Sequence, residues 1–181
     1  MSRTNHIQLM ASYNAWMNAK LYEAAAKLPA QALTADRKAF FGSLLGTLNH
    51  IVVGDTIWLQ RFTMHPANYA ALDPIRALPA PTSLSQILFA DLPPLAAHRK
   101  MLDEVISRWV ASIREEELDH ALRYANTKGT LFQRRFHSLL THFFNHQTHH
   151  RGQASTLLFQ AGVDVGVTDL LAVIPDERES G

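Results

Sequence analysis

The sequence contains no cysteine among its 181 residues, which excludes disulfide bonds, thiolate metal sites and cysteine nucleophiles. No stretch approaches the roughly 20 consecutive apolar residues that a membrane-spanning helix needs. The N-terminal residues also lack the apolar core of a secretory signal peptide. We therefore expect no membrane partner and a cytoplasmic location.

An excess of charge of either sign is also missing. The chain has 17 Lys and Arg residues and 16 Asp and Glu residues, so its net charge at pH 7 is +1. Nucleic-acid binding depends on clustered basic residues that neutralise phosphates, so we expect no nucleic-acid partner. Hydrophobic residues make up 47% of the chain, which excludes intrinsic disorder and indicates one folded domain over residues 1–181.

The spacing of apolar residues predicts four long helices, over residues 4–28, 41–64, 84–113 and 135–160. Pro29 ends the first helix and Gly162 ends the last. Pro93 and Pro94 lie inside the third. They either kink it or divide it into a short helix and a long one that begins near Pro93.

The connections complete the predicted fold. Residues 65–83 are rich in proline and form a long link that lets the chain cross over instead of turning back tightly. Two β-prone runs flank Asn126 and Gly129 and predict a small hairpin. We predict an all-α fold, a four-helix bundle with a long crossover between helices 2 and 3 and a small β-hairpin before helix 4. The core spans about residues 5–162, and residues 163–181 form an irregular tail.

The second predicted helix is apolar on nearly all sides. Such a helix is buried on most sides or lies at an oligomer interface, so we expect a homodimer. Gly46 and Gly54 flank His50 one helical turn away in each direction. Glycine weakens a helix, so these two residues either leave space for a ligand beside the imidazole or permit close packing.

The most unusual feature is the number of histidines, ten in all, of which four lie within residues 142–150. Residues four apart share one face of a helix, so His146 and His150 point the same way. Two imidazoles one turn apart can occupy adjacent corners of a metal coordination sphere. His142 and His146 form a competing pair, and His149 lies close to the same face. Spacing alone does not choose among them.

A bound metal usually needs at least three protein ligands, so a third must come from another helix. His50 is the best candidate because it lies within a helix of buried character. The other five histidines lie near helix ends, in loops or by the hairpin, and we expect them at the surface: His6, His65, His98, His120 and His137. The His-Glu-x-x-His pattern of metalloproteases is absent, because residues 147–149 are Gln, Thr and His.

Three motifs in this order resemble those of one protein family. They are Tyr13-Asn14-Ala15-Trp16 in the first helix, Leu48-Asn49-His50 through Phe62 in the second, and His146-Gln147-Thr148-His149-His150-Arg151-Gly152-Gln153 in the last. With them, residues 5–162 resemble the DinB/YfiT-like superfamily of metal-dependent four-helix bundles. This resemblance implies that His50, His146 and His150 are the metal ligands.

The resemblance also implies a function, because family members include thiol-dependent transferases and isomerases. Three neutral imidazoles leave a divalent ion its full charge and an open position, where a thiol or water becomes a nucleophile. All-nitrogen ligation fits zinc or nickel, with iron as a further candidate. We expect a thiol S-transferase or hydrolase that acts on a small-molecule substrate and uses a low-molecular-weight thiol.

Two alternatives stay open at this point. In the first, the protein is a non-catalytic bundle with a structural metal and a role in assembly or stress response. A fourth ligand such as His142 or His149 would favour this alternative. In the second, no metal binds and the histidines are solvated at the surface.

Metal-bound histidines usually donate their second ring nitrogen to a polar partner. The polar residues in otherwise apolar helices are Asn49, Asp55, Asn145 and Gln153. Asp55 lies five residues after His50, on another face of the helix. A structural pairing with Arg151 or another basic group is therefore more typical of Asp55 than a catalytic role.

Overall fold

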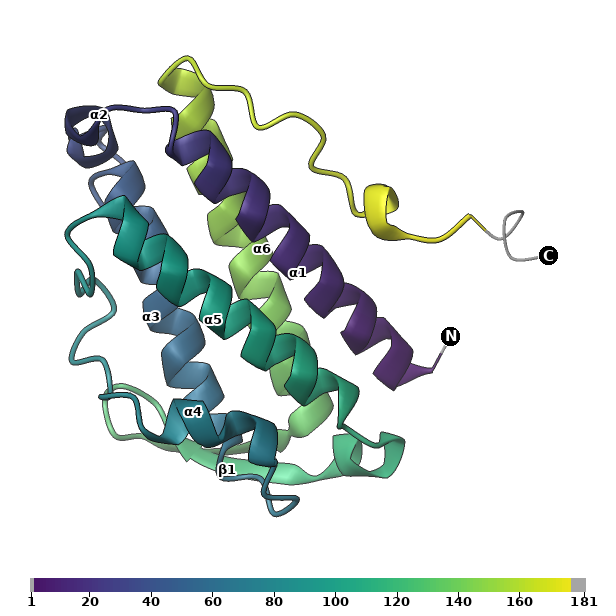
Figure 1. Ribbon diagram of the computed structural model, residues 1–181. Coiled ribbons are helices and arrows are strands. Elements are labelled where there is room, and N and C mark those ends of the chain that lie inside the picture. Colours follow the sequence, from purple (N-terminus) through teal and green to yellow (C-terminus); the bar gives the residue numbers. More distant parts are fainter. Residues whose placement is uncertain (1, 177–181) are drawn as a thin grey trace.

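The computed structural model describes residues 2–176, which are mostly helical (Figure 1). The four long helices are α1 (Arg3–Ala25), α3 (Leu44–Phe62), α5 (Leu92–Ala111) and α6 (Phe136–Gln160). The connections contain α2 (Ala30–Thr34), α4 (Asp73–Arg76), η1 (Ala70–Leu72), η2 (Glu115–Asp119) and η3 (Leu170–Val173). The strands β1 (Ala121–Ala125) and β2 (Leu131–Arg135) precede α6. The part of the predicted tail beyond residue 176 lies outside the described residues.

Polar caps start two of the long helices. The Ser2 hydroxyl accepts a hydrogen bond from the Asn5 amide at 3.1 Å, and the Ser43 hydroxyl accepts one from the Gly46 amide at 3.0 Å. Each cap satisfies an amide that has no partner within its helix. Gly162 follows α6 at φ +83°, as expected of a helix stop. The first, second and fourth predicted helices differ from the observed ones only at their ends.

The long third helix begins near Pro93, as one of the two alternatives for its prolines predicted, and the expected helical start at residue 84 is wrong. Residues 84–91 form turns and bends, and α5 begins at Leu92. Pro93 and Pro94 occupy its first turn, where a missing amide hydrogen costs nothing. The preceding segment is held instead by Asn49, whose side-chain oxygen accepts from the amides of Leu88 at 2.9 Å and Phe89 at 3.0 Å.

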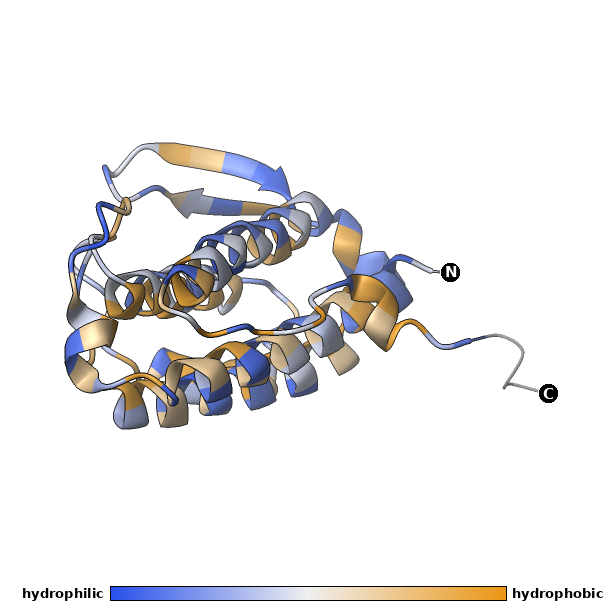
Figure 2. Cartoon of the chain, turned by 90° about the horizontal axis from the view of Figure 1, so that it is seen from above, coloured by the Kyte–Doolittle hydropathy of each residue, from blue (hydrophilic) through white to orange (hydrophobic). Residues whose placement is uncertain are grey.

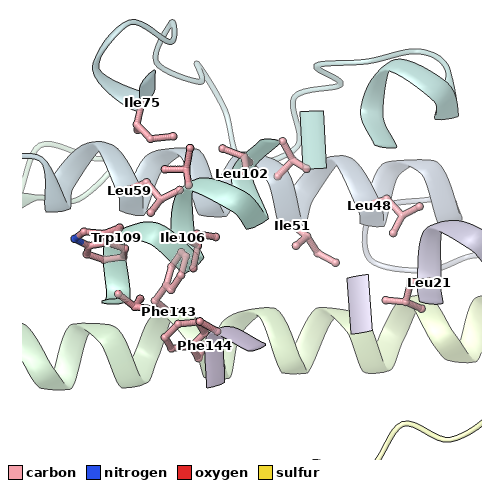
Figure 3. Close-up of a cluster of buried hydrophobic side chains, with 14 of the residues drawn as sticks. Leu21, Leu48, Ile51, Leu59, Ile75, Leu102, Ile106, Trp109, Phe143 and Phe144 are labelled. Carbon is pink, nitrogen blue, oxygen red and sulfur yellow. The ribbon is translucent and has the colours of Figure 1, made fainter. Parts of the chain in front are cut away.

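The long helices enclose the hydrophobic core. Helix α1 contacts α5 and α6, and α3 contacts α6 and α5. Leu21, Leu48 and Trp109 are fully buried among them, beside Ile51 and Phe143 (Figure 3). Burying each large side chain of this kind stabilises the fold by about 1.5–3 kcal/mol, so the core fixes the spacing of α3 and α6.

The predicted hairpin is confirmed. Strands β1 and β2 pair antiparallel from Ala121 opposite Arg135 to Ala125 opposite Leu131. Gly129 adopts φ +81° in the turn, a conformation that favours glycine. The hairpin lies at the edge of the helical body in both views (Figures 1 and 2).

Burial within one chain accounts for the apolar character of α3. The helix contacts α2, α4, α5 and α6, and most of its residues are buried. Its composition therefore no longer indicates a second copy, and the homodimer stays a prediction. Within residues 2–176, no helix is both long and apolar enough to cross a lipid bilayer.

An ion pair lies inside the core between α3 and α5. Asp55 pairs with Arg99, and both side chains are almost completely buried. The Nη2 atom of Arg99 also lies 2.9 Å from Oδ1 of Asp103, one turn further along α5. The expected basic partner of Asp55 is therefore Arg99. Asp55 makes no contact with a histidine.

The other long helices join the same network. The Asn18 side chain of α1 donates to Oδ1 of Asp103 at 2.9 Å, and that of Asn14 donates to the same atom at 3.1 Å. The Asn14 oxygen in turn accepts from Nη1 of Arg151 on α6. We call these six residues the buried charge cluster: Asn14, Asn18, Asp55, Arg99, Asp103 and Arg151. It links all four long helices.

We predict that Asp55→Ala lowers the free energy of unfolding by about 3 kcal/mol, because it leaves Arg99 buried with half of its compensating charge. Urea denaturation followed by circular dichroism measures the change. Asp36→Ala is the control, because it removes a carboxylate from an exposed ion pair with Lys38 and should change stability little. Equal midpoints for the wild type and Asp55→Ala would contradict the prediction.

Candidate metal centre

Three histidines from two helices converge on one point. His50 of α3 meets His146 and His150 of α6, with one ligand nitrogen from each lying within 4.8 Å of the others. His50 and His150 are 5% and 9% exposed, and His146 is half-buried. Within residues 2–176, no other three potential ligands of this kind come together. The structure therefore brings together the three residues that the resemblance implied.

The two glycines of α3 have different roles. A Cβ atom on Gly54 would lie 2.7 Å from Cε1 of His146, so glycine leaves the space that this imidazole occupies. A Cβ atom on Gly46 would lie 2.2 Å from the carbonyl oxygen of Phe41 and would displace that backbone. Gly54 therefore permits the close approach of α6, and Gly46 permits the close approach of the loop before α3. Both agree with the interpretation that these glycines allow close packing.

In His50 and His150, the hydrogen bond made by Nδ1 determines that Nε2 is the nitrogen available to a metal. Nδ1 of His50 lies 2.7 Å from the carbonyl oxygen of Leu84, which can only accept, so Nδ1 carries the proton. Nδ1 of His150 lies 2.8 Å from Oε1 of Gln153 and donates to it in this amide orientation. Nε2 of each ring then carries a lone pair, as a metal ligand requires.

These two lone pairs face each other. Nε2 of His50 lies 3.1 Å from Nε2 of His150, a repulsive arrangement unless a cation lies between them. A metal with bonds of about 2.0–2.1 Å would hold two nitrogens roughly 2.9 Å apart in octahedral geometry and roughly 3.3 Å apart in tetrahedral geometry. The observed separation fits both. A proton on one Nε2 would also bridge the pair, but Gln153 would then have to turn its amide nitrogen toward His150.

Burial keeps the three imidazoles neutral. It lowers the pKa of His146 to about 3, and repulsion from charge on His150 and His50 adds to this effect. Burial also lowers the pKa of His50 and of His150, although hydrogen bonds to Leu84 and Gln153 oppose it. Histidine binds metal in its neutral form, so protons compete weakly for this site near neutral pH.

Phe41 and Leu84 are neighbours of the site that the sequence did not reveal. The Phe41 ring stacks on His50 with a centroid distance of 3.8 Å and meets His150 edge-on at 5.6 Å. Gly46, three residues after the Ser43 position that caps α3, was the available signal for this close approach. Leu84 contributes a backbone carbonyl, which any residue possesses, so its identity carried no signal.

The competing histidines lie outside the group. His142 is exposed, and its ring lies 4.9 Å from that of Trp58. His149 is also exposed and contacts Gln153, with 3.3 Å between Nε2 atoms. Neither belongs to the cluster of convergent ligand atoms.

Of the four proposed polar partners, Gln153 contacts a histidine of the group. Asn49 and Asn145 are corrected, whereas Asp55 has the structural pairing with a basic group that was favoured from the sequence. Asn49 holds residues 88–89, Asp55 lies in the buried charge cluster, and Asn145 is exposed. Periodicity placed these side chains on helices but did not say which faces would meet.

His65 is a further correction, because it was expected at the surface and is 4% exposed. Its Nδ1 accepts from the Ala67 amide at 3.1 Å, and its Nε2 lies 3.3 Å from the Glu117 carbonyl oxygen. Both nitrogens are thus occupied by the backbone, and His65 joins two connecting segments.

We predict that Gly54→Ala weakens zinc binding at least about 10-fold, as loss of ligand positioning commonly does, because the added methyl group displaces His146. Its effect on helix stability alone would be favourable by up to about 1 kcal/mol. Competition with a chromogenic chelator measures the affinity. Gly152→Ala is the matched control, since its Cβ would meet nothing within 4 Å. Equal zinc affinities for Gly54→Ala and the control would show that this space is not needed.

Comparisons with known proteins agree with the motifs in the sequence. The family model described as "DinB family" matches residues 1–179. The chain is 24% identical over 158 residues to "Protein DinB" of Bacillus subtilis (strain 168), a match that covers 87% of each chain. No solved structure matches the chain significantly. Because the family model spans nearly its whole length, this chain belongs to the DinB family.

Proposed function

We propose that this chain is a metal-dependent enzyme that holds one divalent transition metal through His50, His146 and His150. Zinc and nickel suit three nitrogen ligands best, and iron is a further candidate. One observation carries the proposal, the 3.1 Å separation of two Nε2 atoms whose partner nitrogens are already engaged. The donor set and its neutral state both fit a divalent cation.

The three-histidine donor set would leave a coordination position of a bound ion open, which supports catalysis over a structural role. Within residues 2–176, no fourth histidine or carboxylate joins the three ligands, and His142 and His149 lie apart. When bound, a divalent cation supplies Lewis acidity, which makes water or a thiol acidic enough to react near neutral pH. A structural site would normally be closed by a fourth protein ligand.

The surrounding residues prepare the ligands for this chemistry. The Leu84 carbonyl and Gln153 fix the tautomers of His50 and His150, which orients both lone pairs. The stacked Phe41 ring shields one face of His50 from water. A three-histidine metal site of this kind suits thiol S-transfer to a small electrophile or hydrolysis. A low-molecular-weight thiol is the proposed co-substrate.

We also propose that the four long helices form the bundle expected from the sequence, with residues 63–91 as its crossover. The pairwise contacts of α1 and α3 with α5 and α6 support this topology. In Figure 1, α3 and α5 run in the same direction, so the chain must return along the bundle between them.

We predict one divalent ion per chain after reconstitution and dialysis, and its loss in His50→Ala and His146→Ala. Each variant removes one of three ligands and leaves too few for tight binding. Inductively coupled plasma mass spectrometry measures the metal content. His142→Ala is the matched control on the same face of α6 and should retain the ion. Unchanged metal content in the first two variants would discard the site.

Metal removal separates an enzyme from the alternative, a bundle with a structural ion that serves assembly or stress response. For an enzyme, chelation abolishes turnover in a screen of electrophiles against small thiols, zinc restores it, and helicity is unchanged. A structural ion would couple to folding. Loss of helicity on chelation, without turnover in any metallated sample, would support the alternative.

A further inference from the structure

A cavity of about 310 Å³ opens between the loop that precedes α3 and the C-terminal half of α6. Arg37, Lys38 and Phe40 line it from the loop, and Gln153 and Thr156 line it from α6. This volume is at the lower end for small-molecule sites, enough for one functional group and a short chain.

The cavity lies next to the three histidines. Gln153 lines it and also accepts the hydrogen bond from Nδ1 of His150 at 2.8 Å. Thr47 lines it from α3, three residues before His50. Because three residues are close to one helical turn, the cavity is displaced from the ligands by roughly 5 Å along both helices. The cavity therefore begins about one helical turn from two of the ligands.

The two cations of the cavity differ in their partners. Nζ of Lys38 lies 2.6 Å from Oδ2 of Asp36, so that charge is already matched. Arg37 forms no ion pair with any carboxylate of residues 2–176, and its Nη2 makes one long contact of 3.5 Å to the Ala32 carbonyl oxygen. Its Nε is buried and has no hydrogen-bond partner. The Nε atoms of Arg99 and Arg151 are also buried without a partner. The feature that distinguishes Arg37 is therefore the missing carboxylate, which leaves its positive charge available to an anion from outside the chain.

The larger cavity between α1 and α5, of about 820 Å³, offers a contrast. Arg99 and Asp103 line it, but the guanidinium of Arg99 is matched by Asp55 and Asp103 within the fold. Its charge is therefore used internally. The guanidinium beside the histidines has no such partner.

We propose that Arg37 is a specificity-determining residue that binds a carboxylate of the substrate of the three-histidine site. The planar guanidinium can pair with both oxygens of a carboxylate, which a lysine cannot do. The inference rests on the proposed function, and it narrows the thiol to a small mercaptocarboxylate. Its carboxylate lies at Arg37 and its sulfur at the open position of the metal. The sulfur binds as thiolate, and its proton leaves to solvent.

Cobalt-substituted protein provides a readout that does not depend on turnover, because thiolate binding to Co²⁺ produces a charge-transfer absorption. Mercaptoacetate, 3-mercaptopropionate and 4-mercaptobutyrate are titrated against 2-mercaptoethanol, which lacks the carboxylate. We expect at least one acid to bind about 10-fold more tightly than the neutral thiol, the gain typical of a charge-assisted hydrogen bond. Arg37→Gln should abolish this preference and leave the affinity for 2-mercaptoethanol unchanged.

Lys38→Gln is the matched control and should retain the preference, because the charge that it removes is paired with Asp36. Loss of the preference in Lys38→Gln, or its persistence in Arg37→Gln, would overturn the assignment to Arg37. Equal binding of the acids and the neutral thiol by the wild type would also overturn it. Thiolate absorption in those titrations would still support the proposed metal site.

Metal-free protein tests the inference independently of the proposed function. The Arg37 Nε–H resonance should shift on titration with propionate and should not shift with propionamide. Cobalt that fails to bind would refute the proposed function and with it the role in substrate binding, while a propionate shift would still support a carboxylate site at Arg37. A resonance unaffected by propionate would refute the carboxylate site, whatever the metal does.

Discussion

The buried charge cluster is the interaction on which the rest of this structure depends. Asp55 comes from α3, Arg99 and Asp103 from α5, Asn14 from α1 and Arg151 from α6. Buried charges are tolerated only where their partners are in place. Any shift of one long helix along another would separate buried partners. The cluster thus favours one register among helices whose apolar faces alone would permit several.

That register is what makes the histidine site possible. Gly54 precedes Asp55, and successive helical residues point roughly 100° apart. One of them therefore faces α5 through the ion pair while the other leaves space for His146 on α6. Two consecutive residues of α3 therefore stabilise the core and make room for the histidine site. Imidazoles from two helices can meet at a few ångströms only if both helices are held this firmly.

The sequence predicted the elements with local signals and failed where distant segments meet. Apolar spacing located the long helices, and the spacing of His146 and His150 placed both rings on one face. Residue spacing left His142 and His149 as competitors, and the family resemblance chose among them. The prolines marked the start of α5 as one alternative. The non-helical segment before it was missed, because it is held by Asn49, forty residues away. The Leu84 carbonyl could not be predicted, since its role depends on where that segment passes.

The residues of the site are divided between helices and loops, with the three histidines on helices and most of the groups around them on loops. The three histidines lie on α3 and α6, rigid elements that the core holds in place. Gln153 on α6 contacts one of them, and the other groups around them come from loops, Phe41 and Arg37 before α3 and Leu84 before α5. Loops tolerate substitution and insertion because they contribute little to the core. For the proposed function, substitutions in these loops would therefore alter the substrate while leaving the ligands in place, whereas a change of metal would need changes in the helices themselves.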